Sequence, residues 1–234
     1  MDFFYIIYMN LISFDPFRTI TLPGTQHLSS KQFFSHASII QEADWILFPE
    51  YWQVNVLHYI WRQRIFPNIA TYHLGHNKIE MTRAFTAVAP SHVPETHILS
   101  NSPENQDRII HDLFHFPFVA KDVKSSSGHG VFLVENKKQW RDYYSDHDVL
   151  YVQEALPINR DMRIVVIGDK AVAGYWRVQT LGRFHTNVAQ GGEVIQEVIP
   201  LHAMVWVEWL AQRFHFELIS AAVIMFIGGI RLLF

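Results

Sequence analysis

The 234-residue chain contains no cysteine. It therefore forms neither disulfide bonds nor thiolate-bound metal sites, and we expect it in the reducing cytoplasm. Charged residues make up only 18% of the chain, and the net charge is −3. This balance gives no electrostatic reason to expect nucleic acid or an anionic membrane surface as a partner. Hydrophobic residues make up 49%, which is typical of a globular protein able to bury a large core.

Long uninterrupted apolar runs are also lacking. Residues 3–12 form an apolar run, but Asp2 precedes it and no basic residue does, so it makes a poor signal peptide. The run at residues 218–230 is interrupted by two glycines and is shorter than the roughly 20 residues of a membrane-spanning helix. We expect both runs to be buried strands. The 14 histidines are scattered without an HExxH-type pair, so they predict no metal site.

Residues 1–75 have the pattern of a small α/β domain. Short apolar runs at 3–9, 45–48 and 69–72 predict strands. Residues 54–65 have apolar side chains at helical spacing, and we expect Pro67 to end that helix. The alternation of strand, helix and strand predicts a parallel sheet.

Residues 76–234 predict a second, larger domain, divided into a central part at about 76–150 and a C-terminal part at about 151–234. We expect helices at 78–88, from Ser102 through an apolar face that ends at Phe114, at 137–144 and at 202–214. Apolar runs predict the strands 96–99, 116–123, 131–134, 149–152, 161–167, 171–177, 192–199, 218–226 and 229–234.

The segment from 116 to 156 carries the clearest chemical signal. Lys121 lies in an apolar strand, and a loop of small residues at 124–130 connects that strand to the next. Serine and glycine offer backbone N–H groups with little side-chain bulk, so such a loop can close over an anion beside the lysine. The same composition is also typical of a simple turn. Both interpretations, a polyphosphate site and a plain connection, are open at this point.

Six pieces follow one another with characteristic spacing. They are Lys78, Phe118-Val119-Ala120-Lys121, the loop 125–131, Val152-Gln153-Glu154, Asp161-Met162-Arg163, and Arg177 with 184–187 and Gly191-Gly192. Over roughly residues 70–234 this order resembles the ATP-grasp ligases, and within them the RimK-like amino-acid ligases. The resemblance implies an α+β ATP-grasp fold, in which two subdomains clamp ATP, preceded by a small α/β domain. It also implies a reaction in which ATP, a carboxylate and an amine give an amide through an acyl phosphate.

The resemblance also implies a role for each matching residue. Lys78 and Lys121 would bind the phosphates under a lid that includes Ser127, Gly128 and Gly130. Gln153, Glu154, Ala155 and Leu156 would form the adenine-binding hinge, and Asp161 would bind the ribose. Arg163, Arg177 and Asn187 would face the reacting groups, with Arg177 and Asn187 as the catalytic candidates. Arg163, His185 and Thr186 would be cofactor-binding residues. His185 stands where the family usually has arginine.

Each of these residues also has an ordinary structural interpretation. Lys78 would be a solvated helix residue and Lys121 an edge-strand lysine. Glu154 would end a surface strand, Arg177 would be exposed on one, and Asn187 would occupy a turn. Asp161 would cap a strand or form a salt bridge to Arg163.

The sequence departs from the family at the magnesium ligands. The first acidic position falls at about Ala222 or Val223, neither of which binds a hard cation. The second, a Glu-x-Asn, falls at or beyond Phe234. We therefore assign no metal ligand, although ATP with Mg²⁺ is the cofactor set that the family implies. Two interpretations follow. The chain is either an incomplete piece of a ligase or an inactive nucleotide-binding or protein-interaction module. A homo-oligomer is compatible with both.

Overall fold

The computed structural model describes residues 9–125, 130–180, 186, 188, 191–226 and 229–233, and gives only the backbone from 218 onwards. The chain forms two compact units. The first comprises Met1–Tyr72 with Arg213–Leu218, and the second comprises His73–Gln212 with Ile219–Phe234.

The first unit is built on a parallel sheet of order β2-β1-β3-β4. Its strands are β1 (Leu11–Ser13), β2 (Thr25–His27), β3 (Trp45–Leu47) and β4 (Ile65–Phe66). Its short helices are α1 (Pro16–Thr19), η1 (Ser30–Gln32), α2 (Ala37–Gln41), α3 (Tyr51–Asn55) and the π-helical turn η2 (Val56–Ile60). Buried side chains on this sheet, including Ile12, Phe33, Ile46 and Leu57, form the core of the unit. The predicted parallel sheet and the strand at 45–48 are confirmed.

Two predictions for this unit are wrong. Residues 69–72 are not a strand, because they begin α4 (Ile69–His76), whose first turn is capped by the Asn68 side chain accepting from the Thr71 N–H at 3.1 Å. The predicted helix 54–65 already ends at Ile60, and Arg62 follows in a left-handed conformation with φ of 58°. Pro67 therefore follows β4 and does not end the helix. Of the strand expected at 3–9, only Met9 lies within the described residues.

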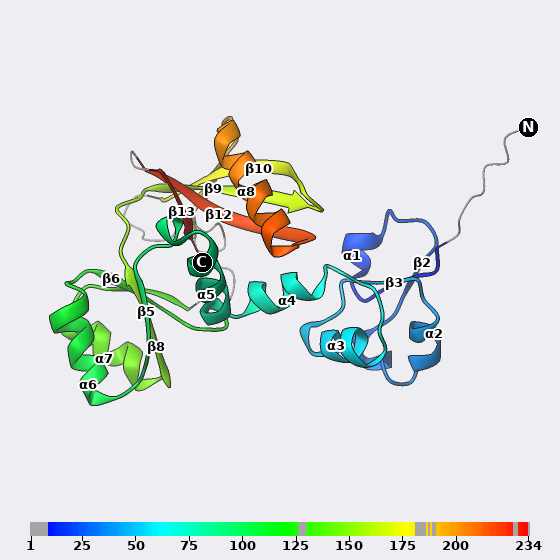
Figure 1. The fold of residues 1–234 in the computed structure, drawn as a ribbon, viewed down its shortest axis with the longest axis horizontal. Coiled ribbons are helices and arrows are strands. Elements are labelled where there is room, and N and C mark those ends of the chain that lie inside the picture. Colours follow the sequence, from blue (N-terminus) through cyan, green and yellow to red (C-terminus); the bar gives the residue numbers. More distant parts are fainter. Residues whose placement is uncertain are drawn as a thin grey trace, which may run out of the picture. The chain divides into compact units, whose positions relative to one another are not determined.

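The second unit contains two sheets. The first is antiparallel, with order β5-β8-β6-β7 (Figure 1). Its strands are β5 (Thr96–Ser100), β6 (Phe118–Lys121), β7 (Val131–Val134) and β8 (Val149–Glu154). Its helical segments are α5 (Lys78–Val88), η3 (Pro90–His92), α6 (Pro103–Arg108), the π-helical turn η4 (Ile109–Leu113) and α7 (Lys137–Ser145). All of these elements except η3, which was not predicted, were predicted to within a few residues.

The first sheet has one apolar face and one polar face. Phe118 and Ala120 of β6 pack in the core with Val152 of β8, together with Trp140 of α7. Side chains alternate between faces along a strand, so Lys121 and Gln153 lie on the opposite face. This second face is approached by α5, because the Thr82 hydroxyl of α5 hydrogen-bonds the Tyr151 hydroxyl of β8 at 2.7 Å.

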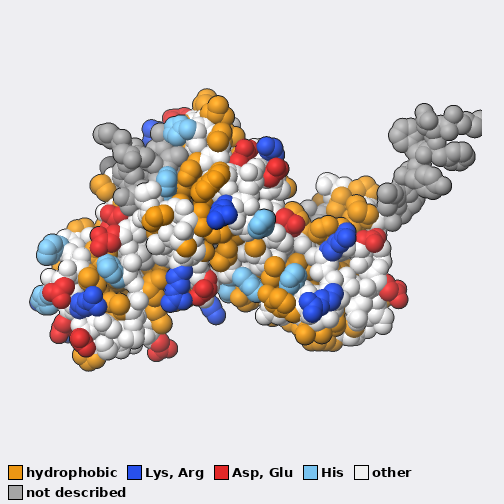
Figure 2. All heavy atoms as spheres, viewed as in Figure 1, with side chains coloured by type: hydrophobic (Ala, Val, Ile, Leu, Met, Phe, Trp, Pro, Cys, Tyr) orange, Lys and Arg blue, Asp and Glu red, His pale blue; other side chains and the backbone are white. Residues whose placement is uncertain are grey.

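The second sheet has the order β11-β10-β9-β12-β13. Its strands are β9 (Arg160–Ile167), β10 (Lys170–Val178), β11 (Glu193–Ile195), β12 (Leu218–Phe226) and β13 (Gly229–Leu233), and α8 (Leu201–Phe214) runs along it (Figure 1). The predicted hairpins β9–β10 and β12–β13 are confirmed. Leu201, Val205 and Trp209 of α8 stay exposed, and hydrophobic side chains gather over this helix in Figure 2. No helix in the described part of the chain is long and apolar enough to span a membrane.

The apolar face of the first sheet yields a stability prediction. Phe118 is fully buried and its ring packs near Phe114, Phe116 and Trp140. We expect Phe118→Ala to lower the free energy of unfolding by about 3–5 kcal/mol, because it leaves a cavity. Phe132 on the neighbouring strand is 41% exposed, so Phe132→Ala should cost much less. Urea denaturation followed by circular dichroism measures both, and equal losses would contradict this core assignment.

Candidate functional site

Lys121 is the buried cation of the polar face. It lies at the end of β6, is only 3% exposed, and its Nζ donates to Gln153 Oε1 at 2.7 Å. Its amine also lies 6.0 Å from the centre of the Tyr151 ring. Lysines are rarely buried unless their charge has a purpose or a partner. The edge-strand interpretation of Lys121 is therefore excluded by its burial.

Lys78 approaches the same region from α5. Asn77 caps this helix by accepting from the Ile79 N–H at 2.9 Å, and the Lys78 N–H donates to Val123 O at 3.0 Å. These bonds fix the start of the helix beside the end of β6. The Lys78 side chain is 6% exposed, and its Nζ donates to the Ser125 carbonyl at 2.9 Å and hydroxyl at 2.8 Å. Lys78 is thus not a solvated helix residue.

The two lysines influence each other electrostatically. Burial, and then the positive charge of Lys78, lower the pKa of Lys121 from 10.5 to about 7. Burial also lowers the pKa of Lys78, and the charge of Asp122 partly opposes that shift. Two ammonium groups close to one another in a poorly solvated site favour a bound anion, which would stabilise both charged forms. The two lysines are therefore electrostatically coupled, and their joint role toward phosphates stays a prediction.

The two ends of the loop between β6 and β7, at Asp122 and Gly130, lie close together. Gly130 has φ of 68°, and a Cβ there would lie 2.0 Å from Asp122 Oδ2, so this position requires glycine. The Asp122 N–H donates to Gly130 O at 2.8 Å, and Asp122 Oδ1 lies 2.6 Å from His147 Nε2. The predicted lid residues Ser127 and Gly128 lie outside the described residues.

The expected hinge begins in β8. Gln153 is 2% exposed and bonds Lys121, as described above. Glu154 is tied to the start of β5, because its N–H donates to Glu95 O and its Oε1 accepts from the Glu95 N–H, both at 2.9 Å. Ala155 and Leu156 follow as half-buried residues. The Glu154 carboxylate is therefore engaged by backbone, whereas a role of these residues toward adenine stays a prediction.

A buried ion pair organises the second sheet. Asp161 is fully buried, and its Oδ1 accepts from Arg177 Nε and lies 2.8 Å from Nη2. Its Oδ2 accepts from the Thr186 hydroxyl. The carboxylate thus acts as the counter-ion of Arg177, which itself is only 7% exposed. The geometry favours this role over the ribose contact that the resemblance implied, and it excludes an exposed Arg177.

Arg163 lies on the same face as this pair. In the β9–β10 register Asp161 is opposite Arg177 and Arg163 is opposite Tyr175, to which Arg163 hydrogen-bonds. Burial, followed by the positive charge of Arg177, lowers the pKa of Arg163. Arg177 is paired with Asp161, whereas Arg163 feels the Asp161 charge without an ion pair to it. His185 and Asn187 lie outside the described residues.

The residues of the second sheet do not fit a magnesium ion. Ala222 and Val223 lie in β12, where they pair with Leu233 and Leu232 of β13, so neither position supplies an oxygen from its side chain. Within the described ranges, no group of three histidine or acidic residues is placed to hold a metal. We therefore derive no step through a metal ion.

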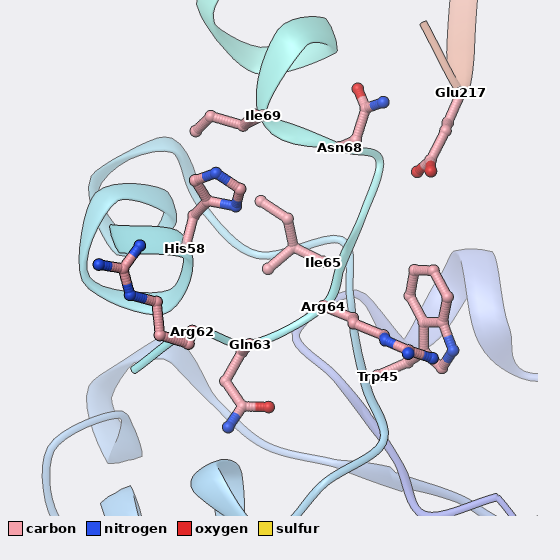
Figure 3. Close-up of a pocket in the computed structure, with 9 residues that line it drawn as sticks. All are labelled: Trp45, His58, Arg62, Gln63, Arg64, Ile65, Asn68, Ile69 and Glu217. Atoms are coloured by element: carbon pink, nitrogen blue, oxygen red, sulfur yellow. The ribbon is translucent and has the colours of Figure 1, made fainter. Parts of the chain in front are cut away.

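A separate pocket of about 370 Å³ lies in the first unit (Figure 3). Glu217 Oε2 is buried there without a hydrogen-bond partner among the described residues, and burial raises the pKa of its carboxyl group. The pocket contains none of the residues that the sequence predicted for a nucleotide. Its lining residues are Trp45, His58, Arg62, Gln63, Arg64, Ile65, Asn68, Ile69 and Glu217.

Sequence reasoning missed two side chains that hold this site together, Thr96 and Tyr143, and it placed Ser125 only within the phosphate-covering loop, without its bond to Lys78. Thr96 accepts from Gln153 Nε2 at 2.7 Å, Ser125 accepts from Lys78, and Tyr143 donates to Lys121 O at 2.8 Å. Thr96 and Gln153 are paired in the β5–β8 register. Only strand pairing reveals this neighbour, whereas Ser125 could have been inferred from its place at the start of the loop.

Comparison with known proteins identifies the class. The profile of the RimK-like ATP-grasp domain matches residues 77–202, more than half of the chain. A structure titled RimK domain protein ATP-grasp from Sphaerobacter thermophilus superposes with a TM-score of 0.62 at 18% identity, covering 82% of this chain and 72% of that one. D-alanine–D-alanine ligase from Bacillus anthracis gives 0.65 at 11% identity, covering 89% and 74%. The fold is therefore that of the ATP-grasp ligases.

The chain belongs to the RimK-like ATP-grasp domain family. Among curated relatives, a probable alpha-L-glutamate ligase of Legionella pneumophila is 31% identical over 103 residues, which is 42% of this chain and 34% of the relative. Human beta-citrylglutamate synthase B is 31% identical over 88 residues, or 35% and 22% of the two chains. The match thus spans about a third or less of the length of these relatives.

The buried ion pair of the second sheet can be tested. Asp161→Asn leaves the Arg177 guanidinium buried without its counter-ion, so we expect the free energy of unfolding to fall by about 3–5 kcal/mol. The exposed pair Arg160–Glu197, at 3.2 Å, is the matched control. Arg160→Gln should cost no more than about 1 kcal/mol. Denaturant titration gives both values, and a mild effect of Asp161→Asn would argue against a structural role for this carboxylate.

Proposed function

We propose that the chain is the nucleotide-binding part of an ATP-dependent carboxylate–amine ligase. The observation that carries the proposal is the burial of two electrostatically coupled lysines, Lys78 and Lys121, with Lys78 bonded to Ser125. Membership of the RimK-like family and the ATP-grasp fold support it. We also propose the domain division at about 75 and the two-part organisation of residues 76–234.

In this proposal the lysines bind the phosphates of ATP. Charge-assisted hydrogen bonds of this kind contribute roughly 1.5–3 kcal/mol each. The backbone after Glu154 meets the adenine edge, and the glycine loop excludes water from the phosphates. Arg163 and Arg177 hold the anionic substrate groups, since a guanidinium fork matches a carboxylate or phosphate. Asn187, Thr186 and His185 are assigned to the same side of the site by the resemblance.

The proposed reaction has two steps. A carboxylate oxygen of the first substrate bonds to the γ-phosphorus of ATP, and the bond from that phosphorus to ADP breaks. The amine nitrogen of the second substrate then bonds to the acyl carbon, phosphate leaves, and the nitrogen loses a proton. The described residues contribute positioning and positive charge, which is how proteins mainly catalyse phosphoryl transfer.

We propose an amino acid as one of the two substrates, because the relatives are named as glutamate and citrylglutamate ligases. We also propose a cytoplasmic location, where ATP is available and the absence of cysteine is natural. Magnesium, if it takes part, needs ligands outside the described residues.

Nucleotide binding is tested by thermal and chemical unfolding with ADP. At a hundredfold excess over its dissociation constant, ADP should stabilise the protein by about 2.7 kcal/mol. We expect Lys121→Met to abolish this stabilisation, while the exposed-lysine control Lys137→Met retains it. If magnesium increases the stabilisation by ADP, the result supports the ligase. If the stabilisation by ADP is the same with and without magnesium, the result supports a nucleotide-binding module. An unchanged response in Lys121→Met would refute the phosphate assignment.

The lowered pKa of Lys121 predicts a pH dependence. Phosphate binds the ammonium form, which predominates in the free protein only below the pKa of about 7. On this account ADP affinity should be higher below pH 7 than above it, and should fall by up to about tenfold per pH unit well above pH 7, where binding takes up as much as one proton. Calorimetry from pH 7 to 9 in two buffers of different ionisation enthalpy measures both quantities. Constant affinity across this range would contradict the assignment.

A further inference from the structure

A directed chain of hydrogen bonds runs from Lys121 across the first sheet. Lys121 Nζ donates to Gln153 Oε1 at 2.7 Å, and Gln153 Nε2 donates to the Thr96 hydroxyl oxygen at 2.7 Å. The Thr96 hydroxyl donates in turn to Pro94 O at 2.7 Å. The chain thus connects three strands, β6, β8 and β5, and ends on a backbone carbonyl.

The direction of this chain is fixed by chemistry. A lysine ammonium can only donate, so the Gln153 group that faces it must be the carbonyl oxygen. The Thr96 hydroxyl gives its hydrogen to Pro94, so it accepts from the Gln153 amide. A flipped amide would place its NH₂ group against the ammonium and its oxygen against an acceptor. Thr96 therefore locks the orientation in which Gln153 holds Lys121.

Gln153 is buried between Lys121 and Thr96. Its side chain is 2% exposed, and both ends of its amide are engaged by protein groups. These two hydrogen bonds connect the Gln153 side chain to Lys121 on one side and to Thr96 on the other. Lys121 can still donate through its other ammonium hydrogens, because lysine carries three.

We propose that Gln153 is a positioning residue, which holds the Lys121 ammonium toward the phosphates of the nucleotide, and that Thr96 orients Gln153. This inference rests on the proposed function. It reassigns Gln153 from a nucleotide contact to a support of the lysine that makes the contact.

Several charged or titratable groups surround Lys121. Lys78 approaches from α5, Asp122 follows β6 directly, Tyr151 lies on β8, and the Tyr143 hydroxyl of α7 donates to the Lys121 carbonyl. Asp122 is paired with His147, and burial raises the pKa values of Tyr143 and Tyr151 to about 12. Both tyrosines stay neutral below pH 10. A change at residue 153 thus acts mainly on the lysine.

The experiment compares Gln153→Met, Gln153→Glu and Thr96→Val with the wild type and with Gln139→Met, a glutamine control on α7. The protonation of Lys121 in the ligand-free protein is followed by NMR of its labelled side chain from pH 5 to 10. ADP affinity is measured over pH 6–9. The first readout needs no nucleotide, whereas the second does.

Gln153→Glu should move the Lys121 titration up by about one pH unit or more, because a carboxylate stabilises the ammonium. Gln153→Met should move it down, and Thr96→Val should move it the same way by less. At pH 6.5 we expect Gln153→Met to weaken ADP binding by about tenfold, the loss of one good hydrogen bond. Gln139→Met should change neither quantity.

Two results would overturn the inference. One is a Lys121 titration that is identical in all the variants. The other is an ADP affinity that falls by the same factor at every pH in Gln153→Met and Gln153→Glu, as a direct nucleotide contact would require. A wild type that does not bind ADP would instead overturn the proposed function, and the NMR titration would still show whether Gln153 controls the lysine.

Discussion

The site depends on keeping two ammonium groups together in a poorly solvated place. Desolvation and mutual repulsion both disfavour the charged forms of Lys78 and Lys121. The nearest carboxylate in sequence, on Asp122, is paired with His147. The second sheet also places two guanidinium groups on one face, those of Arg163 and Arg177, and of these Arg177 is paired with Asp161. A chain of net charge −3 thus concentrates positive charge on the polar faces of two sheets, where an anionic ligand would relieve the repulsion.

Because successive side chains of a strand point to opposite faces, even a small sheet can combine an apolar core with a buried cation on its other face. Within four residues, β6 places Phe118 and Ala120 in the apolar core and Lys121 on the opposite face. The packing that stabilises the strand is therefore the same packing that fixes the lysine. The helix α5 completes the polar face, because the Lys78 N–H and the Thr82 hydroxyl attach it to the ends of β6 and β8. Stability and ligand binding are assigned to different faces of one sheet.

The sequence could predict those features that depend on local pattern. The helix at 78–88 and the strand around Lys121 follow from spacing and composition, and they place the site. The sequence could not predict which residues far apart in the chain are paired. Asp161 and Arg163 are two residues apart and share a face, so the sequence suggested a bond between them; the hairpin register instead sets Arg177 directly opposite Asp161. The helix at Ile69–His76 was mistaken for a strand because the cap at Asn68, rather than the apolar run that follows it, decides the local structure.

The glutamine at position 153 can fix the position of the Lys121 ammonium without cancelling its charge. A carboxylate at this place would hold Lys121 as firmly as an amide does, but it would cancel the positive charge and repel a phosphate. An apolar side chain would keep the charge but remove the acceptor that Gln153 supplies to the ammonium. Glutamine supplies an acceptor with no net charge, and Thr96 prevents the amide from turning its donor toward the lysine. The hydrogen-bond chain thus fixes the lysine while leaving its charge available to a ligand.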